Sequence, residues 1–226
     1  MTFAWALFLV VTVASFIVQK YLHNRIEKYS RIRSHTGMTG REAAERMLRD
    51  YGISGVSVTS TSGTLTDHYN PADMTVNLSE GVYNQNCIAA IAIAAHECGH
   101  AVQHDAAYKP LKMRSALVPV VNFASTWVSW VLLGGMFLID IFPALLVFGI
   151  ILFATTTLFS FVTLPVEVDA SRRAIRWLIA SNVCDSEELP AAKDALHAAA
   201  YTYVIAAFGS LATLLYYALM LWSNDD

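Results

Sequence analysis

Residues Ile88 to His100 read IAAIAIAAHECGH, and the spacing of their polar members predicts a helix with chemistry on one face. The Ala-rich run before His96 favours a helix, because Ala has the highest helix propensity. Helix positions four residues apart lie on one face, so the imidazoles of His96 and His100 can meet one ion, with Glu97 beside them. This HExxH spacing is typical of zinc sites in which the glutamate acts as a general base.

The same letters can also arise by chance, in which case His96 and His100 would be two surface histidines. The eight apolar residues before the box argue against a surface helix, so we expect a site. Cys98 lies on another face of the helix and is expected to pack in the interior. With Cys87 and Cys184 it gives an odd number of cysteines without CxxC spacing, so no disulfide framework or cysteine-based zinc site is predicted.

The composition is that of a membrane protein. Of the 226 residues, 55% are hydrophobic and only 15% are charged, and the mean hydropathy is +0.45. A soluble domain of this length is usually more polar. The net charge of -3 and the lack of a basic run with interleaved aromatic residues argue against a nucleic-acid partner. The sequence gives no indication of the oligomeric state.

Three apolar stretches could cross a bilayer: residues 3–18, 117–164 and 201–222. A helix needs about 20 residues to cross about 30 Å of hydrocarbon. The middle stretch is therefore long enough for two crossings, joined by a turn near Asp140 and Pro143, and four transmembrane helices are predicted. The first stretch has no basic residues before it and no Ala-x-Ala cleavage pattern, which favours an anchor over a signal peptide.

The Lys and Arg residues predict the orientation. Eleven of the 15 lie between the first and second spans, and the others lie between the third and fourth. The positive-inside rule then places both of these segments in the cytoplasm. The predicted parts are an anchor helix (1–19), a cytoplasmic α+β segment with the HExxH helix (20–115), a two-helix transmembrane hairpin (116–164), cytoplasmic helices (165–200) and a C-terminal transmembrane helix (201–226).

A catalytic zinc site needs a third protein ligand, which must lie on the same side of the membrane. The second cytoplasmic segment holds two candidate carboxylates near its start. At about 100° per residue, Glu167 shares a face with Ala170 and Ala174, small residues that let another helix come close. Asp169 falls on a polar face, where Arg173 is its i,i+4 partner. We expect Glu167 to be the ligand and keep Asp169 as the alternative.

His104 is a weaker candidate for a ligand. It lies about 12 Å along the helix axis from His96, too far for both rings to reach one ion at about 2.1 Å. Zinc enzymes that recruit a third histidine have Gly three residues after the second His and another His three residues later. Gln103 and Ala106 occupy those positions here. We expect His104 to support the ligands or to end the helix.

Upstream of the box, the sequence predicts a small α+β unit. Thr39 and Glu42 form a capping box for a helix that Gly52 closes. Residues 55–60 and 64–68 are predicted to form a hairpin through a Ser62-Gly63 turn, followed by a third strand.

That third strand includes Thr75, Val76, Asn77 and Leu78. It lies just before the HExxH helix, so it could be an edge strand whose free backbone groups pair with an extended substrate. An ordinary interior strand is the alternative.

Several blocks of the chain together resemble the YugP-type membrane zinc metallopeptidases. In chain order they are TDHYNP (66–71), LS (78–79), VY (82–83), AAHECGHAVQ (94–103) and LPVEVDAS (164–171). The resemblance extends from Thr36 to the last apolar stretch. It implies a neutral zinc peptidase of the bacterial cytoplasmic membrane, with one Zn2+ per chain held by His96, His100 and a downstream glutamate.

A more distant resemblance concerns the helix with the third ligand. Glu167, Ala170 and Ala174 match the Glu-x-x-Ala-[Asp/Asn]-x-x-Ala helix of gluzincin-type enzymes, including the HtpX membrane proteases. Ser171 departs from that pattern, because its side chain is shorter than the Asp or Asn that supports the metal site in those enzymes. The oxyanion would need a further donor. Candidates for this donor are His68, Tyr69, Arg172, Arg173, His197 and Tyr201.

The expected fold is a mainly α membrane protein with four transmembrane helices and a small cytoplasmic α+β zincin-like domain. The expected activity is hydrolysis of peptide bonds at the cytoplasmic membrane face, with Glu97 as general base. The expected partners are the lipid bilayer and a membrane-associated polypeptide substrate. Two alternatives stay open. One is an intramembrane zinc protease, although charged Asp105 and Lys109 soon follow the box, and the other is a non-enzymatic membrane scaffold with a structural zinc.

Overall fold

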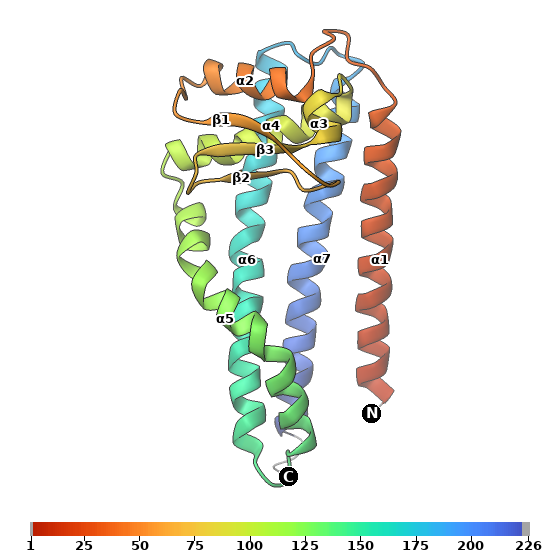
Figure 1. The fold of residues 1–226 in the computed structure, drawn as a ribbon. Helices are drawn as coiled ribbons and strands as arrows, with labels where there is room; N and C mark the ends of the chain where they lie inside the picture. Colours follow the sequence, from red (N-terminus) through yellow and green to blue (C-terminus); the bar gives the residue numbers. More distant parts are fainter. Residues whose placement is uncertain (1, 223–226) are drawn as a thin grey trace. The chain divides into compact units, whose positions relative to one another are not determined.

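The computed structural model describes residues 2–222, without the side chains of residues 2–5 and 8, and it is mainly helical with one small sheet (Figure 1). The chain divides into two compact units. A helical unit comprises the chain up to Ile17, Lys112–Pro165 and the chain from Tyr203 onward. An α/β unit comprises Val18–Leu111 and Val166–Thr202.

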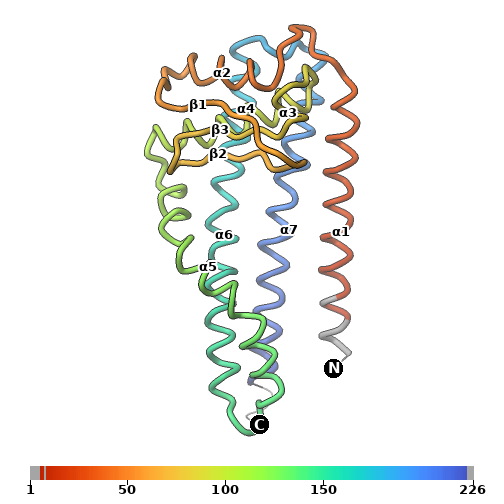
Figure 2. The backbone as a smooth tube through the Cα atoms, in the orientation of Figure 1, coloured from red at the N-terminus to blue at the C-terminus, as the bar shows by residue number. Residues whose placement is uncertain are grey.

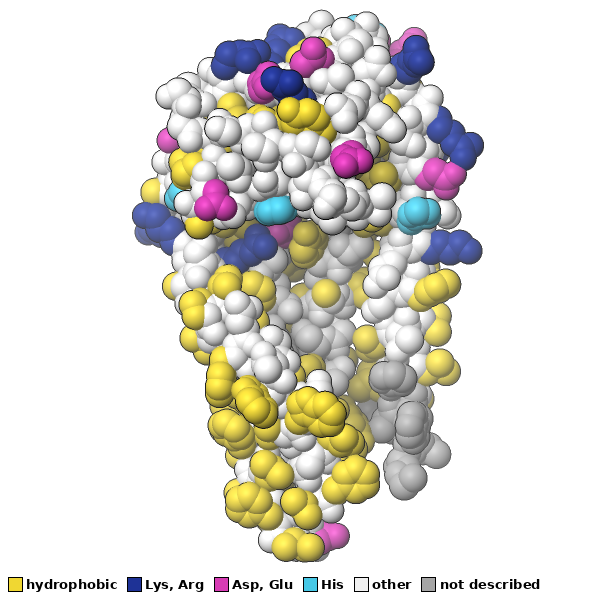
Figure 3. Space-filling view, viewed as in Figure 1, with side chains coloured by type: hydrophobic (Ala, Val, Ile, Leu, Met, Phe, Trp, Pro, Cys, Tyr) yellow, Lys and Arg dark blue, Asp and Glu magenta, His cyan; other side chains and the backbone are white. Residues whose placement is uncertain are grey.

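The long helices of the chain are α1 (Thr2–Ser30), α5 (Lys109–Phe137), α6 (Pro143–Ala180) and α7 (Leu189–Trp222). Among the described residues, α5, α6 and α7 are long and apolar enough to cross a membrane. Large apolar side chains of the helical unit are exposed, and Figure 3 shows them gathered over α5 and its connection to α6. Such an extended apolar surface is suited to lipid.

The fourth predicted span belongs to α1. Its apolar part includes side chains outside the described residues. A membrane crossing by α1 therefore stays a prediction.

The predicted turn in the middle apolar stretch is confirmed, because α5 ends at Phe137 and α6 begins at Pro143. Glycines let the two helices touch. A Cβ atom on Gly135 would lie 2.6 Å from the Cα atom of Leu146, which leaves no room for a larger residue. Small residues at such contacts are common between membrane helices.

The predicted capping box of α2 (Gly40–Asp50) is also confirmed. The backbone N–H of Glu42 donates to Oγ1 of Thr39 at 3.2 Å, and the backbone N–H of Thr39 donates to Oε2 of Glu42 at 2.8 Å. Gly52 adopts a left-handed φ of 71° just after the helix, as a closing glycine does.

The sheet consists of β1 (Ser57–Thr61), β2 (His68–Asn70) and β3 (Thr75–Ser79) in the order β1-β3-β2. β1 runs parallel to β3, and β2 runs antiparallel to it, as can be followed in Figure 2. Val76 and Leu78, on alternate positions of β3, are fully buried. They point to the same face of the sheet, as the twofold period of a strand requires.

The predicted hairpin between residues 55–60 and 64–68 is wrong. Gly63 and Leu65 have left-handed φ values of 102° and 57°, which interrupt any extended strand there. β2 forms its hairpin with β3 instead, through a turn in which Oδ1 of Asn70 accepts the backbone N–H of Ala72 at 2.9 Å.

This arrangement also corrects the prediction of a substrate edge strand. β3 has β2 on one side and β1 on the other, so Thr75, Val76, Asn77 and Leu78 lie on an interior strand. The edges of the sheet are β1 and β2. β2 pairs with one side of β3 as the other arm of the hairpin, and β1 pairs with the other side in parallel orientation.

The short helix α3 (Glu80–Asn84) leads into α4 (Ile88–Asp105), which is the central element of the α/β unit. α4 packs against α2, α3, β2 and β3. Its many Ala residues allow this contact on several sides, and most of its residues are buried. The HExxH box therefore lies on a helix that the core holds in place.

Candidate metal centre

α4 presents the polar side chains of the HExxH box on one face. The ring centroids of His96 and His100 are 4.9 Å apart, and their side chains are 12% and 9% exposed. Glu97 is buried as well, with 8% exposure. Burial of ionisable groups is costly unless they pair with each other or hold an ion. Their burial therefore indicates a specific site.

Glu167 of α6 lies opposite the two histidines. Its Oε2 atom is 3.2 Å from Nε2 of His96 and 3.4 Å from Nε2 of His100. Donors about 2.0–2.1 Å from a tetrahedral zinc lie about 3.3 Å from one another. The spacing of this His96 cluster (His96, His100 and Glu167) therefore fits zinc, and three protein donors leave a fourth position for water or substrate.

Gly99, inside the box, allows α4 and α6 to approach each other. A Cβ atom at this position would lie 2.6 Å from the carbonyl oxygen of Ala170. Ala170 and Ala174 are fully buried, which agrees with the predicted small-residue face of the Glu-bearing helix. The close approach brings the Glu167 carboxylate within reach of α4.

The outer nitrogens of both imidazoles have hydrogen-bond partners. Nδ1 of His96 is 3.1 Å from the hydroxyl of Ser171, which reaches the ring despite its short side chain. Nδ1 of His100 is 3.0 Å from Oε1 of Gln103. Partners at Nδ1 orient the rings and leave the Nε2 lone pairs free to bind a metal.

The sequence did not identify Gln103 as part of the site. Its side chain is fully buried, and Nε2 donates to the carbonyl oxygen of Val166 at 2.7 Å and to Oδ2 of Asp169 at 2.9 Å. These acceptors fix the orientation of the amide, so Oε1 faces His100 and the ring must donate from Nδ1. A signal was present: Gln103 lies three residues after His100, on the same helix face.

Asp169 has the partner that helical spacing predicts. Its Oδ2 atom is 2.6 Å from Nε of Arg173, one turn later on α6. With Gln103 as a second partner, the Asp169 carboxylate is held on the outer side of the His96 cluster. It contacts the site through Gln103.

Local charge and burial shift the pKa values of two side chains of α4, His100 and Cys98. Burial alone would lower the pKa of His100, but the hydrogen bond and the charge of Glu167 outweigh it, and the pKa is raised. Burial, helped by the charge of Glu97, raises the pKa of the Cys98 thiol far above its usual range. Sγ of Cys98 points to the carbonyl oxygen of Ala44 at 3.6 Å, which confirms its predicted packing role.

Other predicted site residues have different partners. The Tyr69 hydroxyl is 2.7 Å from Nδ1 of His104, in the last turn of α4. Nδ1 of His68 donates to the carbonyl oxygen of Thr66 at 2.8 Å. His197 is exposed on α7. These residues lie outside the three-donor His96 cluster.

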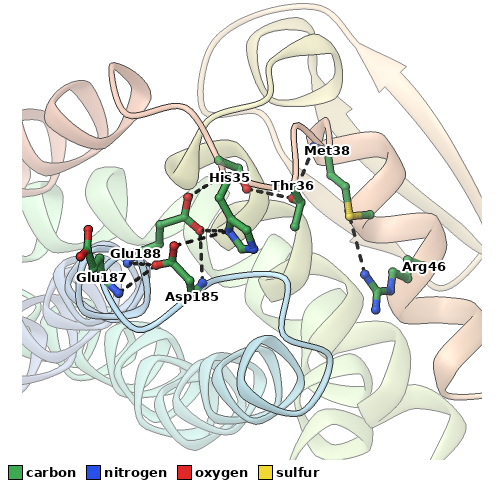
Figure 4. Close-up of polar contacts among 8 residues, drawn as sticks. His35, Thr36, Met38, Arg46, Asp185, Glu187 and Glu188 are labelled. Atoms are coloured by element: carbon green, nitrogen blue, oxygen red, sulfur yellow. Dashed lines mark hydrogen bonds and ion pairs between the residues drawn. The ribbon is translucent and has the colours of Figure 1, made fainter.

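A second group of His and carboxylate side chains occurs in the α/β unit (Figure 4). This His35 cluster consists of His35, between α1 and α2, and of Asp185 and Glu188, just before α7. Nδ1 of His35 is 2.7 Å from Oε2 of Glu188 and 3.9 Å from Oδ2 of Asp185. The shorter distance is that of a direct hydrogen bond.

Comparisons with known proteins agree with this geometry. A protein family described as "Putative neutral zinc metallopeptidase" matches residues 4–222. The "Putative membrane protease YugP" of Bacillus subtilis (strain 168) is 41% identical over 224 residues, which cover 97% of this chain and 99% of that protein. No solved structure matches the chain significantly. The chain therefore belongs to the YugP-type family of neutral zinc metallopeptidases.

Proposed function

We propose that this protein is a membrane-anchored zinc endopeptidase, in which one Zn2+ is held by His96, His100 and Glu167. The observation that carries the proposal is the convergence of two Nε2 atoms and one carboxylate at 3.2 and 3.4 Å. Both Nδ1 atoms are turned outward to Ser171 and Gln103, as ligand histidines require.

The chain provides the remaining parts of peptide hydrolysis. When bound there, zinc would act as a Lewis acid toward water and toward the carbonyl group of the substrate. Glu97 supplies the general base, because it directly follows His96 and lies close enough for its charge to raise the pKa of His100. Its carboxylate accepts a proton from the attacking water and passes it to the leaving amine. The burial of Glu97 restricts competition from bulk water.

The geometry favours this function over the two alternatives. A structural zinc in a scaffold would have a closed site with four protein ligands, whereas the described part of the chain brings three donors together in the His96 cluster. An intramembrane protease would place the box within a spanning helix. α4 packs instead in the core of the α/β unit, and the three candidate spans among the described residues are other helices.

The distribution of Lys and Arg supports a site on the cytoplasmic face of the bacterial cell membrane. Polypeptides at that membrane are the proposed substrates. Single cysteines introduced at exposed positions of the α/β unit, labelled from either side of sealed vesicles, test the orientation. Labelling from the periplasmic side alone would contradict it.

Metal analysis and proteolysis of the same purified protein test the activity. We expect about one zinc per chain and cleavage of an unfolded protein, with Glu97→Gln lowering kcat by about 10²–10⁴-fold while zinc is retained. Glu187→Gln, at an exposed position, is the matched control. Cleavage that survives Glu97→Gln would reject the proposal.

A further inference from the structure

The face of α4 that holds the His96 cluster continues toward the start of the helix as an apolar stripe. At about 100° per residue, Ala89, Ala90 and Ile93 share the face of His96, Glu97 and His100. Ile93 lies about 4.5 Å along the axis from His96. The metal ligands and this apolar stripe therefore form one continuous surface of α4.

A pocket of about 340 Å³ opens over the apolar part of this stripe. Ala89, Ala90 and Ile93 line it from α4, and Ile26 of α1, Leu65 and Val82 line it from other segments. All of these residues belong to the α/β unit. A space of this size accepts a large side chain, and its apolar lining favours a nonpolar one.

Four of the polar residues that border the pocket have partners within the protein. Asp67 accepts the backbone N–H of Ser79 at 2.7 Å and its hydroxyl at 3.1 Å. Glu27 forms an ion pair with Arg31, and the hydroxyl of Ser30 donates to the carbonyl oxygen of Glu27 at 2.7 Å. These contacts leave the apolar walls as the surface available to a ligand.

Leu65 is a second sign of an apolar ligand. It has a left-handed φ of 57° and is 59% exposed, an unfavourable combination for a large apolar residue. A ligand side chain in the pocket would cover part of this exposed surface and remove it from water.

We infer that this pocket binds a large nonpolar side chain of the polypeptide substrate, within two residues of the scissile bond. The inference rests on the proposed peptidase function. An extended chain advances about 3.3 Å per residue, so a residue one or two positions from the bond over the metal reaches Ile93. The site then selects substrates by apolar side chains next to the cleaved bond.

A matched pair of glycine variants tests this selectivity. Gly81 lines the pocket and Gly55 does not, and a Cβ atom at either position meets nothing within 4 Å. Both glycines therefore accept a side chain. Gly81→Phe is designed to place an aromatic ring at the wall of the pocket, and Gly55→Phe serves as the control. Cleavage sites in an unfolded protein are mapped by mass spectrometry for the zinc-loaded full chain.

We expect the wild-type protein and Gly55→Phe to select Leu, Phe or Met at one position near the bond. Gly81→Phe should lower cleavage at such sites by about 10–100-fold relative to sites with Ala or Gly there. Identical site preferences in all three active proteins would overturn the inference.

A second measurement does not depend on turnover. A peptide that contains the photoreactive residue benzoylphenylalanine is crosslinked to three full-length proteins. One carries Glu97→Gln alone, and the other two carry Glu97→Gln combined with Gly81→Phe or with Gly55→Phe. Crosslinks to Ile26, Leu65 or Val82 that Gly81→Phe removes and Gly55→Phe keeps would support the pocket. Crosslinks elsewhere, or a pocket filled by co-purified lipid with no peptide crosslink, would overturn it. If the wild-type protein forms these crosslinks but cleaves no substrate, the peptidase proposal is rejected while the binding pocket is supported.

Discussion

The His96 cluster and the His35 cluster contain the same kinds of side chain but differ in spacing. In the His96 cluster, the carboxylate lies 3.2 and 3.4 Å from two ring nitrogens. In the His35 cluster, one ring nitrogen lies 2.7 Å from the carboxylate of Glu188 and 3.9 Å from that of Asp185. Donors around one tetrahedral zinc are separated by about 3.3 Å, whereas the 2.7 Å contact in the His35 cluster is clearly shorter than this spacing and the 3.9 Å contact is clearly longer. Only the first arrangement matches a shared ion.

The partners of the carboxylates explain the difference. Oε1 of Glu188 accepts the backbone N–H of His35 at 2.6 Å, and Oδ1 of Asp185 accepts the backbone N–H groups of Glu187 and Glu188 at 2.8 and 2.9 Å. These bonds begin a helix and attach a loop to it. Glu167 instead directs its carboxylate to two rings whose other nitrogens are already bonded. Residue types alone therefore do not identify a metal site.

The largest contrast is expected for zinc content. Glu167→Gln replaces an anionic ligand by a neutral amide, so zinc should fall from about one per chain to well below half, and peptidase activity should be lost. Glu188→Gln should leave zinc content unchanged. Inductively coupled plasma mass spectrometry of both purified variants measures this. Loss of zinc from Glu188→Gln, with Glu167→Gln unaffected, would assign the metal to the His35 cluster.

Loss of the Gln103 amide should weaken zinc binding without abolishing it. Gln103→Leu keeps a bulky side chain but removes the acceptor at Nδ1 of His100. The zinc dissociation constant should rise about 10–100-fold, as for other residues that orient metal ligands. Competition with a chelator measures it, and Gln85→Leu, at an exposed position, is the control. An unchanged dissociation constant in folded Gln103→Leu protein would exclude this positioning role.

The close contact of α4 and α6 should be sensitive to a single methyl group. In Gly99→Ala the new Cβ would lie 2.6 Å from the Ala170 carbonyl oxygen, so the helices must separate. We expect a loss of about 1–3 kcal/mol in stability together with weaker zinc binding. Gly55→Ala has open space around its Cβ and should change neither. Thermal unfolding in detergent, with and without chelator, separates the two effects.

The features that the sequence predicted well depend on nearby residues. The capping box of α2 and the turn between α5 and α6 each follow from a few adjacent positions. The placement of Glu167 also followed from helical period, because its small-residue face can be read along one helix. The HExxH helix was predicted from its own composition.

The features that the sequence missed depend on distant contacts. β1 and β3 pair in parallel although β2 lies between them in the sequence. A residue with a left-handed backbone such as Leu65 has no clear signature in the sequence. Gln103 binds Val166, which is 63 positions away in the chain. The alternating pattern of β3 is the same for an interior and an edge strand, so only the pairing on both sides distinguishes them.

The smallest effect is expected at His35. His35→Gln removes the ring bond to Glu188, while the backbone N–H at this position still donates to the same carboxylate. The side chain is 38% exposed, so water replaces part of the lost bond, and stability should fall by only about 1 kcal/mol. Zinc content and kcat should stay at the wild-type values, because the His35 cluster is a hydrogen-bonded loop contact. A second zinc per chain in the wild-type protein, lost in His35→Gln, would contradict this interpretation and make the His35 cluster a second metal site.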